Sequence, residues 1–268
     1  MLTPDLINFA LFLVTGAMVG LLAGLLGVGG GLLVVPILLY LLPQLGVDPS
    51  QVTHIAVATS LATIVFTSIA SVKAHNRQGT VIWWVFRAMT PGIVLGGIIG
   101  SFSARYIDSD NLKMIFGVFA LLIATQMIIK FRPPEKSREP GKLRLFFSGS
   151  LIGSFSTLVG IGGGSLTVPY LIFWKTKMAR AVGTSSAIGL PLSISGTTGF
   201  IISGWGSPAL PDWSLGYVFL PAFLGIVMVS SFTAPIGARL ASKISGKLLS
   251  RVFASFLIVV GLDILLIL

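Results

Sequence analysis

Two short glycine-rich stretches are the residues of this sequence best suited to hold a ligand. The first covers residues 27–31 with the sequence Gly-Val-Gly-Gly-Gly, and the second covers 160–164 with Gly-Ile-Gly-Gly-Gly. Each precedes a short apolar segment. A helix that starts there exposes unpaired backbone N–H groups, and its dipole adds positive partial charge. Glycine lets an anion approach that backbone closely. The predicted anion site comprises Gly29, Gly30, Gly31, Gly162, Gly163, Gly164 and Ser165.

Hydroxyl side chains in two matching segments could complete this site. Thr59 and Ser60 end a run that aligns with the run ending in Thr184 and Ser185. A hydroxyl can hydrogen-bond a sulfonyl or carboxylate oxygen without carrying a fixed charge. Two alternatives stay open: the hydroxyls bond only to neighbouring helices or to their own helix, and the glycines only allow helices to pack closely.

Residues for enzymatic chemistry are scarce. The chain has no cysteine, two histidines and eight acidic residues. It contains no Ser-His-Asp set, no paired carboxylates and no cluster of metal-ligating residues, and no Gly-Lys-Ser/Thr follows the glycines to form a nucleotide-binding loop. We therefore predict that the protein is not an enzyme and that it holds no cofactor or metal. A coupling ion, if one is used, could be a proton on His54, a sodium ion on freed backbone carbonyls, or a proton on the anion itself.

The composition is that of a protein embedded in a lipid bilayer. Hydrophobic residues make up 54% of the 268 positions and charged residues only 10%, whereas about a quarter of a soluble domain is charged. The net charge of +10 does not indicate nucleic-acid binding, because the basic residues lie in short loops between apolar segments. Such loops are typical of the cytoplasmic side of membrane proteins.

Ten apolar segments position these residues. They cover 6–27, 31–43, 52–72, 81–104, 112–131, 144–160, 164–174, 180–202, 213–236 and 248–268. The second and seventh, which follow the glycine-rich stretches, would reach only about 16–20 Å as helices, against a hydrocarbon core of about 30 Å. Either each glycine break lies inside one kinked span, which gives eight crossings, or the chain turns back there, which gives ten passes.

The basic residues favour ten passes. All of them except Arg87, Arg105, Lys113 and Arg251, which leaves 14 of the 18, lie within four loops. These loops cover 73–80, 130–144, 175–180 and 239–247. Ten passes place all four on one side of the membrane, and eight passes divide them between both sides. We therefore predict cytoplasmic basic loops and both termini outside.

The second half of the chain is a diverged copy of the first. Residues 27–36 align without a gap with 160–169, and both stretches end in proline. The halves cover 1–131 and 144–268, and residues 132–143 form a cytoplasmic linker.

An odd number of segments per half implies that the copies are inserted in opposite orientations. The loop at 43–51 carries only Asp48, whereas its counterpart at 175–180 carries Lys175, Lys177 and Arg180. Opposite charge bias in equivalent loops is what inversion predicts, and inverted repeats are typical of secondary transporters. The predicted fold is an all-α polytopic membrane protein with two inverted five-segment repeats, in which eight long helices accompany two short broken or re-entrant segments.

At these motifs the sequence resembles the sulfite exporter TauE/SafE family, also called the toluenesulfonate uptake permeases. The resemblance covers nearly the whole chain and rests on Gly20–Gly31 with Pro36, on Gly160–Gly164 with Pro169, on the paired Thr-Ser runs, and on Asn76–Gly79. It implies a bacterial or archaeal inner-membrane transporter of sulfite, sulfonates or related organosulfur anions.

The leading hypothesis is a secondary transporter that moves small sulfur-containing anions by alternating access, with the anion held at the helix starts of the two glycine breaks. An anion-selective channel and a transporter of another small carboxylate or oxyanion are the alternatives. The expected partners are a small anionic substrate, the lipid bilayer, and a coupling proton or sodium ion, without nucleic acid. The oligomeric state stays open, with a homodimer as one alternative.

Overall fold

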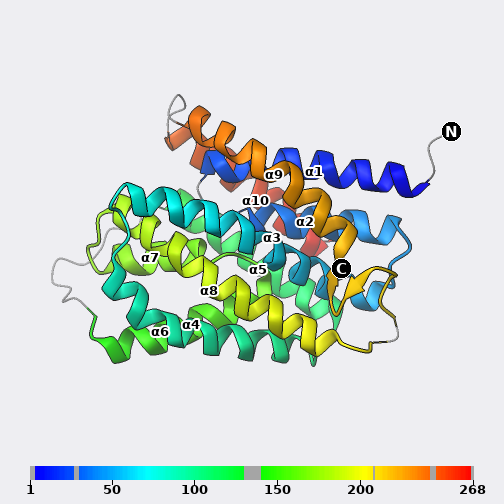
Figure 1. The fold of residues 1–268 in the computed structure, drawn as a ribbon, viewed down its shortest axis with the longest axis horizontal. Coiled ribbons are helices and arrows are strands. Elements are labelled where there is room, and N and C mark those ends of the chain that lie inside the picture. Colours follow the sequence, from blue (N-terminus) through cyan, green and yellow to red (C-terminus); the bar gives the residue numbers. More distant parts are fainter. Residues whose placement is uncertain (1–3, 27–29, 130–139, 208, 242–245, 267–268) are drawn as a thin grey trace.

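The protein is a bundle of helices lying roughly side by side (Figure 1). A computed structural model describes residues 4–26, 30–129, 140–207, 209–241 and 246–266. Within these residues the helices are α1 (Pro4–Leu26), α2 (Gly31–Gln44), α3 (Pro49–Arg77), α4 (Trp83–Ala104), α5 (Ser109–Ile128), α6 (Lys142–Val159), α7 (Gly164–Phe173), α8 (Met178–Gly204), α9 (Leu220–Ala241) and α10 (Gly246–Leu266). Two short strands, β1 (Ser214–Leu215) and β2 (Val218–Phe219), precede α9.

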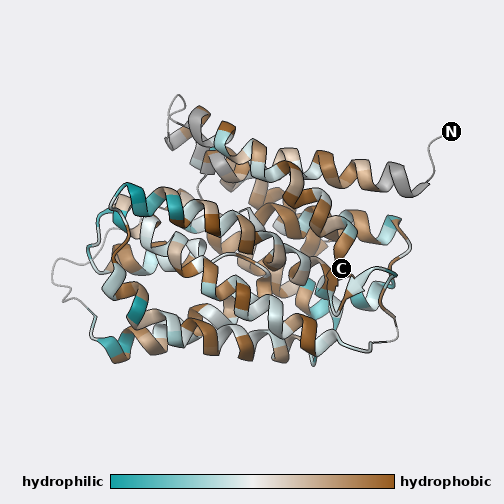
Figure 2. Ribbon diagram, viewed as in Figure 1, coloured by the Kyte–Doolittle hydropathy of each residue, from teal (hydrophilic) through white to brown (hydrophobic). Residues whose placement is uncertain are grey.

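The surface confirms an all-α, multi-pass membrane protein. Among the described residues, five helices are long and apolar enough to cross a membrane, namely α3, α4, α5, α8 and the part of α9 from Leu220 to Gly237. Large apolar side chains point outward from the bundle, among them Leu122 at 61% exposure and Phe232 at 77%. Figure 2 shows apolar residues along the middle of the helices and polar residues gathered toward the helix ends. Such a surface is suited to lipid rather than to water.

Each glycine break is followed by a short helix of its own. A Cβ atom on Gly30 would lie 3.3 Å from side-chain atoms of Val19 and Ala23, so α2 starts alongside the last turns of α1. The 14 residues of α2 and the 10 of α7 reach about 21 and 15 Å. α2 then pairs with α3, and α7 pairs with α8. Both short segments therefore form separate helices, each packed against the long helix that follows it.

Glycines set the direction of the closest helix pairs. Gly16 contacts the backbone of Ile226, and Gly20 contacts Ser230 one turn further along both helices, so α1 and α9 run parallel. Gly92 contacts Phe146, and Gly96 contacts Ser150, in the same way, so α4 and α6 also run parallel. A side chain at these glycines would collide with the neighbouring backbone, and the helices therefore approach closely as in other membrane bundles.

Two further pairs run antiparallel. In α3 and α8, Leu61 lies against Gly196 while Ser68 lies against Gly189. In α5 and α10, Gly117 contacts Leu265 and Leu121 contacts Gly261. α3 and α8, which occupy matching positions in the two halves of the sequence, therefore cross the bundle in opposite directions.

The predicted start of the ninth segment at residue 213 is wrong. Residues 214–219 form a tight hairpin in which Ser214 pairs with Phe219, and α9 starts only at Leu220. Trp213 and Gly216 adopt positive φ angles of 63° and 54°. A positive φ at the first central residue suits a two-residue β-turn, and apolar patterning does not reveal it.

The basic segments of the described chain gather at one end of the bundle. The C-terminal end of α3, the start of α6 and the α7–α8 connection all lie at the left in Figure 1. We call this the basic end, defined by Lys73, Arg77, Lys142, Arg144, Lys175, Lys177 and Arg180, and the opposite end the hairpin end. Lys73 and Arg77 lie on the last turns of α3 rather than in a loop as predicted, because α3 continues to Arg77. Most of the predicted linker falls outside the described residues, as do residues 242–245 of the predicted 239–247 loop. The rest of that loop belongs to the end of α9 and the start of α10.

Candidate functional site

The two glycine breaks meet in the centre of the bundle. A Cβ atom on Gly31 would lie 2.8 Å from the carbonyl oxygen of Gly160. The Ser60 hydroxyl of α3 donates a hydrogen bond to that oxygen at 2.8 Å and lies 3.5 Å from the carbonyl oxygen of Gly31. Ser60 thus ties the start of α2 to the end of α6. The structure therefore brings together the two stretches and one of the hydroxyls that the sequence singled out.

A small polar cavity lies beside the second break. It has a volume of about 30 Å³, close to that of a single water molecule. Its lining consists of Ile64, Thr67, Ser68, Ser71, Gly162, Gly163, Gly164, Ser185, Ser186 and Gly189. The Ser165 hydroxyl, on the first turn of α7, is buried and has no hydrogen-bond partner among the described residues. Four of the predicted residues therefore line one cavity, and the unpartnered hydroxyl of a fifth lies on the same helix start.

Three hydroxyls of this cavity were missed from the sequence. Thr67, Ser68 and Ser71 come from the C-terminal half of α3 and face the start of α7 across the cavity. Ser68 directly follows Thr67, and Ser71 comes four residues after Thr67. A spacing of four places Thr67 and Ser71 on the same side of a helix. That pattern in an apolar segment is a signal that could have identified them.

Beside the described residues of the first break, Gly30 and Gly31, larger side chains occupy the positions that small residues hold beside the second. At the offset that relates Ser60 to Ser185, Leu61 and Ile64 replace Ser186 and Gly189. The Cδ1 atom of Ile64 would lie 2.7 Å from a Cβ atom on Gly31. Gly30 and Gly31 are buried in this packing, and Gly29 lies outside the described residues.

The two predicted threonines join the halves of the protein. Thr59 accepts a hydrogen bond from the backbone N–H of Phe219 at 3.1 Å, just before α9. Thr184 accepts one from the backbone N–H of Ile82 at 2.9 Å, just before α4. Both side chains are fully buried, and neither lines the cavity. Their observed contacts are therefore with neighbouring helix starts.

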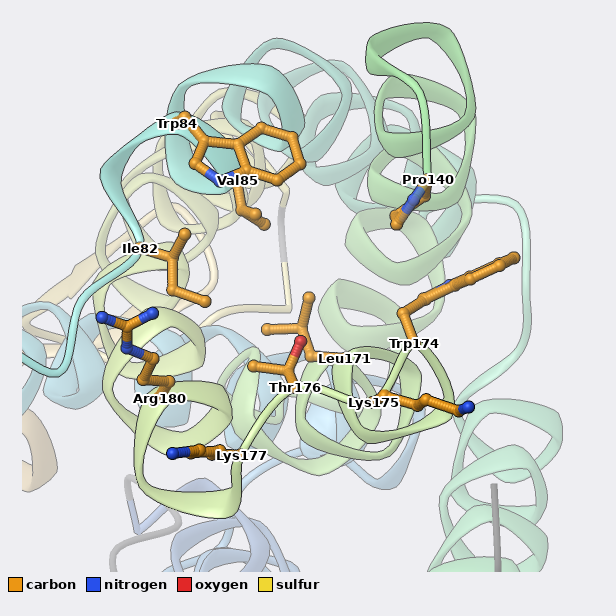
Figure 3. Close-up of a pocket in the computed structure, with 10 residues that line it drawn as sticks. All are labelled: Ile82, Trp84, Val85, Pro140, Leu171, Trp174, Lys175, Thr176, Lys177 and Arg180. Carbon is orange, nitrogen blue, oxygen red and sulfur yellow. The ribbon is translucent and has the colours of Figure 1, made fainter. Parts of the chain in front are cut away.

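A larger cavity of about 450 Å³ lies at the basic end, between the α7–α8 connection and the start of α4. Figure 3 shows Leu171 and Thr176 at its centre, with Lys175, Lys177 and Arg180 around it and their charged ends spread apart. The Arg144 guanidinium lies 5.2 Å from the centre of the Trp174 ring, which also lines the cavity. The rim is thus positively charged without forming a single chelating cluster.

A third cavity, of about 390 Å³, lies at the hairpin end. Its lining comprises Pro49, Ser50, Gln51, His54, Arg105, Ile107, Asp108, Ser109, Asp110 and Tyr217. Burial raises the pKa of the Tyr217 hydroxyl, and the nearby Arg105 opposes this shift. The cavity lies next to the start of α3, as the basic-end cavity lies next to the start of α8.

Comparison with known proteins decides the family. The sequence model of the family described as "Sulfite exporter TauE/SafE" matches residues 12–264. The chain belongs to this family. It is 40% identical to a "Probable membrane transporter protein" of Haemophilus influenzae, over 96% of this chain and 97% of the relative. A protein of the same description from Methanocaldococcus jannaschii is 33% identical over 97% of both chains. No solved structure matches.

Membership of the TauE/SafE family makes the chain a membrane transporter rather than an enzyme. The described residues contain no group of three or more His, Cys, Asp or Glu side chains that could hold a metal ion. What this TauE/SafE protein offers at its centre is a set of neutral donors, namely the N–H groups at the start of α7 and the hydroxyls around them. Such donors can hold an oxyanion without a buried lysine or arginine.

Proposed function

We propose that this chain is a secondary transporter that carries small sulfur-containing anions, such as sulfite or sulfonates, across the inner membrane by alternating access. The observation that carries the proposal is the meeting of two glycine breaks at Ser60, with a polar cavity beside the second break. A carrier needs a central site that faces one side at a time. Hydroxyls line the second break, whereas apolar side chains pack against the described residues Gly30 and Gly31 of the first, and this asymmetry fits such a state.

The directions of the helices support an inverted repeat with halves at 1–131 and 144–268. Equivalent helices α3 and α8 run antiparallel, as do α5 and α10. Ten passes produce these directions, whereas eight continuous spans would make both pairs parallel. Thr59 and Thr184 make equivalent contacts, because each accepts a hydrogen bond from a backbone N–H just before a helix in the other half. These reciprocal contacts also support an inverted repeat.

The cavity lies toward the basic end, which we take to be cytoplasmic because of its positive charge. Ser68 and Ser71 in its wall belong to the half of α3 that ends there. Ile64, which also lines the cavity, precedes Thr67 on α3 and therefore lies on the side toward the hairpin end. In the opposite state the space beside the first break would open and that beside the second would close.

The anion would bind to the backbone N–H groups of residues 163–165 and to the hydroxyls of Ser165 and Ser185. The present cavity of about 30 Å³ must widen before an oxyanion fits. The positive rim formed by Lys177 and Arg180 would raise the local concentration of anions at the entrance, an effect that salt weakens.

Flux into proteoliposomes tests this proposal. Purified protein should take up labelled sulfite or labelled toluenesulfonate with saturation, and unlabelled anion inside should accelerate uptake by exchange. Liposomes without protein provide the control. A flux that rises without saturation and shows no exchange would indicate a channel instead. Absence of flux of both anions would contradict the proposal.

A further inference from the structure

His54 lies in the cavity at the hairpin end with one ring nitrogen unused. The side chain is only 4% exposed. Its Nε2 atom lies 2.9 Å from the carbonyl oxygen of Ala104. A carbonyl oxygen only accepts hydrogen bonds, so Nε2 carries the hydrogen and Nδ1 is left with a lone pair. Nδ1 is buried and has no hydrogen-bond partner among the described residues.

The ring of His54 is held in this orientation. The Tyr217 ring stacks on it with a centroid distance of 5.1 Å and an interplanar angle of 29°. A flip of the imidazole would break the bond to Ala104, so the hydrogen stays on Nε2 and Nδ1 remains the free acceptor. One turn earlier on α3, the Oε1 atom of Gln51 is a second buried acceptor without a partner. Its amide nitrogen donates a hydrogen bond to the Ser50 hydroxyl oxygen at 3.2 Å.

Two unpartnered acceptors on one face of α3 call for a donor from the cavity that they line. A buried acceptor without a donor is unfavourable, and the cavity of about 390 Å³ is large enough to hold water. The charged groups around it are Asp108 and Asp110 against Arg105, with the Tyr217 ring on the remaining side. A carboxylate such as that of Asp108 stabilises a positive charge on a nearby imidazole.

We propose that His54 takes up the coupling proton of transport from the hairpin end, at Nδ1. This inference rests on the proposed transporter function. The proton moves from water or hydronium in the cavity onto the Nδ1 lone pair, and Nε2 keeps its hydrogen and its bond to Ala104. The imidazolium so formed lies on the same helix as Ser60, about 9 Å further along α3. Protonation thereby adds a charge to the helix that ties the two glycine breaks together.

Proteoliposomes containing wild type, His54→Gln and His75→Gln test the inference. Labelled toluenesulfonate is the probe, because a sulfonate stays anionic and any pH effect then belongs to the protein. A proton gradient should drive accumulation by the wild type. His54→Gln should lose this accumulation by about tenfold, within the usual range of coupling between sites, while exchange at equal pH changes by less than about twofold. His75, whose Nδ1 lies 3.1 Å from the Thr80 hydroxyl at the basic end, provides the matched control and should behave as wild type.

The variant Asp108→Asn provides a second test of the inference in which His54 is unchanged. Loss of the nearby negative charge should move the pH dependence of gradient-driven uptake to lower pH. Normal accumulation by His54→Gln would overturn the inference. The inference would also be overturned if a proton gradient did not accelerate exchange by the wild type. The proposed transporter function would then still stand. Absence of any exchange in the wild type would overturn both.

Discussion

Ser60 links the two glycine breaks by a hydrogen bond. Its hydroxyl donates to the Gly160 carbonyl, and that carbonyl lies against Gly31. Ser185, its counterpart in the second half, donates instead to Val182 of its own helix at 3.0 Å and lines the cavity. Matching residues thus have different roles, one structural and one facing the cavity.

This difference predicts that substitution of Ser60 affects stability, whereas substitution of Ser185 affects anion binding. Ser60→Ala should lower the free energy of unfolding by about 1–3 kcal/mol, because the buried Gly160 carbonyl loses its hydroxyl donor. Ser185→Ala should leave stability nearly unchanged and weaken anion binding, since it removes only the bond to Val182 within its own helix and a hydroxyl that lines the cavity. Thermal unfolding in detergent and flux measurements separate the two effects. Equal loss of stability in both variants would contradict the assignment.

At the scale of the elements, α3 depends on a cap at the hairpin end. Asp48 accepts hydrogen bonds from the Ser50 hydroxyl at 2.7 Å and from the Ser50 backbone N–H at 2.8 Å. The bond from the Ser50 hydroxyl, and to a smaller extent the bond from the Ser50 backbone N–H, hold the pKa of the Asp48 carboxyl below its ordinary 3.8. Its contribution to stability is therefore complete above pH 3.8 and is lost as the pH falls through the lowered pKa.

Asp48→Ala should accordingly lower the melting temperature at neutral pH, because the start of α3 loses its cap. The difference from wild type should shrink as the pH falls below 3.8. Asp48→Asn can still cap the helix but does not titrate, so it provides the control whose melting temperature should stay close to that of wild type at neutral pH. A difference between wild type and Asp48→Ala that stays constant down to pH 3 would argue against the cap.

The helices could be predicted from the sequence far better than the residues at which they end or the side chains that line the site. Long apolar segments predict helices such as α4 and α8, because lipid leaves the backbone no other partners. The hairpin at 214–219 escaped prediction, because it depends on backbone angles at Trp213 and Gly216 rather than on apolar pattern. Within the site, the glycines were found because two copies of a rare motif stand out. The hydroxyls of α3 were not, because their spacing marks one side of a helix but only tertiary packing brings that side to the start of α7.

At the scale of the whole molecule, the described structure places the α7–α8 connection at the same end as the end of α3. This arrangement can be tested in cells, since the chain has no cysteine and single cysteines can be introduced. Gln44→Cys should react with an impermeant thiol reagent from outside, whereas Gln78→Cys and Thr176→Cys should react only after permeabilisation. Labelling of Thr176→Cys together with Gln44→Cys would instead support eight continuous spans.

The placement of the anion at the start of α7 is the central claim for the whole molecule. A Cβ atom on Gly163 would find its nearest neighbours at 3.4 Å, so a side chain can be accommodated there without a severe clash, yet it would fill the cavity. Gly141, which has open space around its Cβ position at the start of α6, offers a matched control.

Saturable flux of labelled toluenesulfonate by Gly163→Val and Gly141→Val tests this claim most directly. Gly163→Val should insert and melt as wild type does but lose at least about tenfold in flux at low substrate, equivalent to about 1.4 kcal/mol of lost binding, and Gly141→Val should retain it. Wild-type flux and affinity in Gly163→Val would show that the anion does not bind at this helix start.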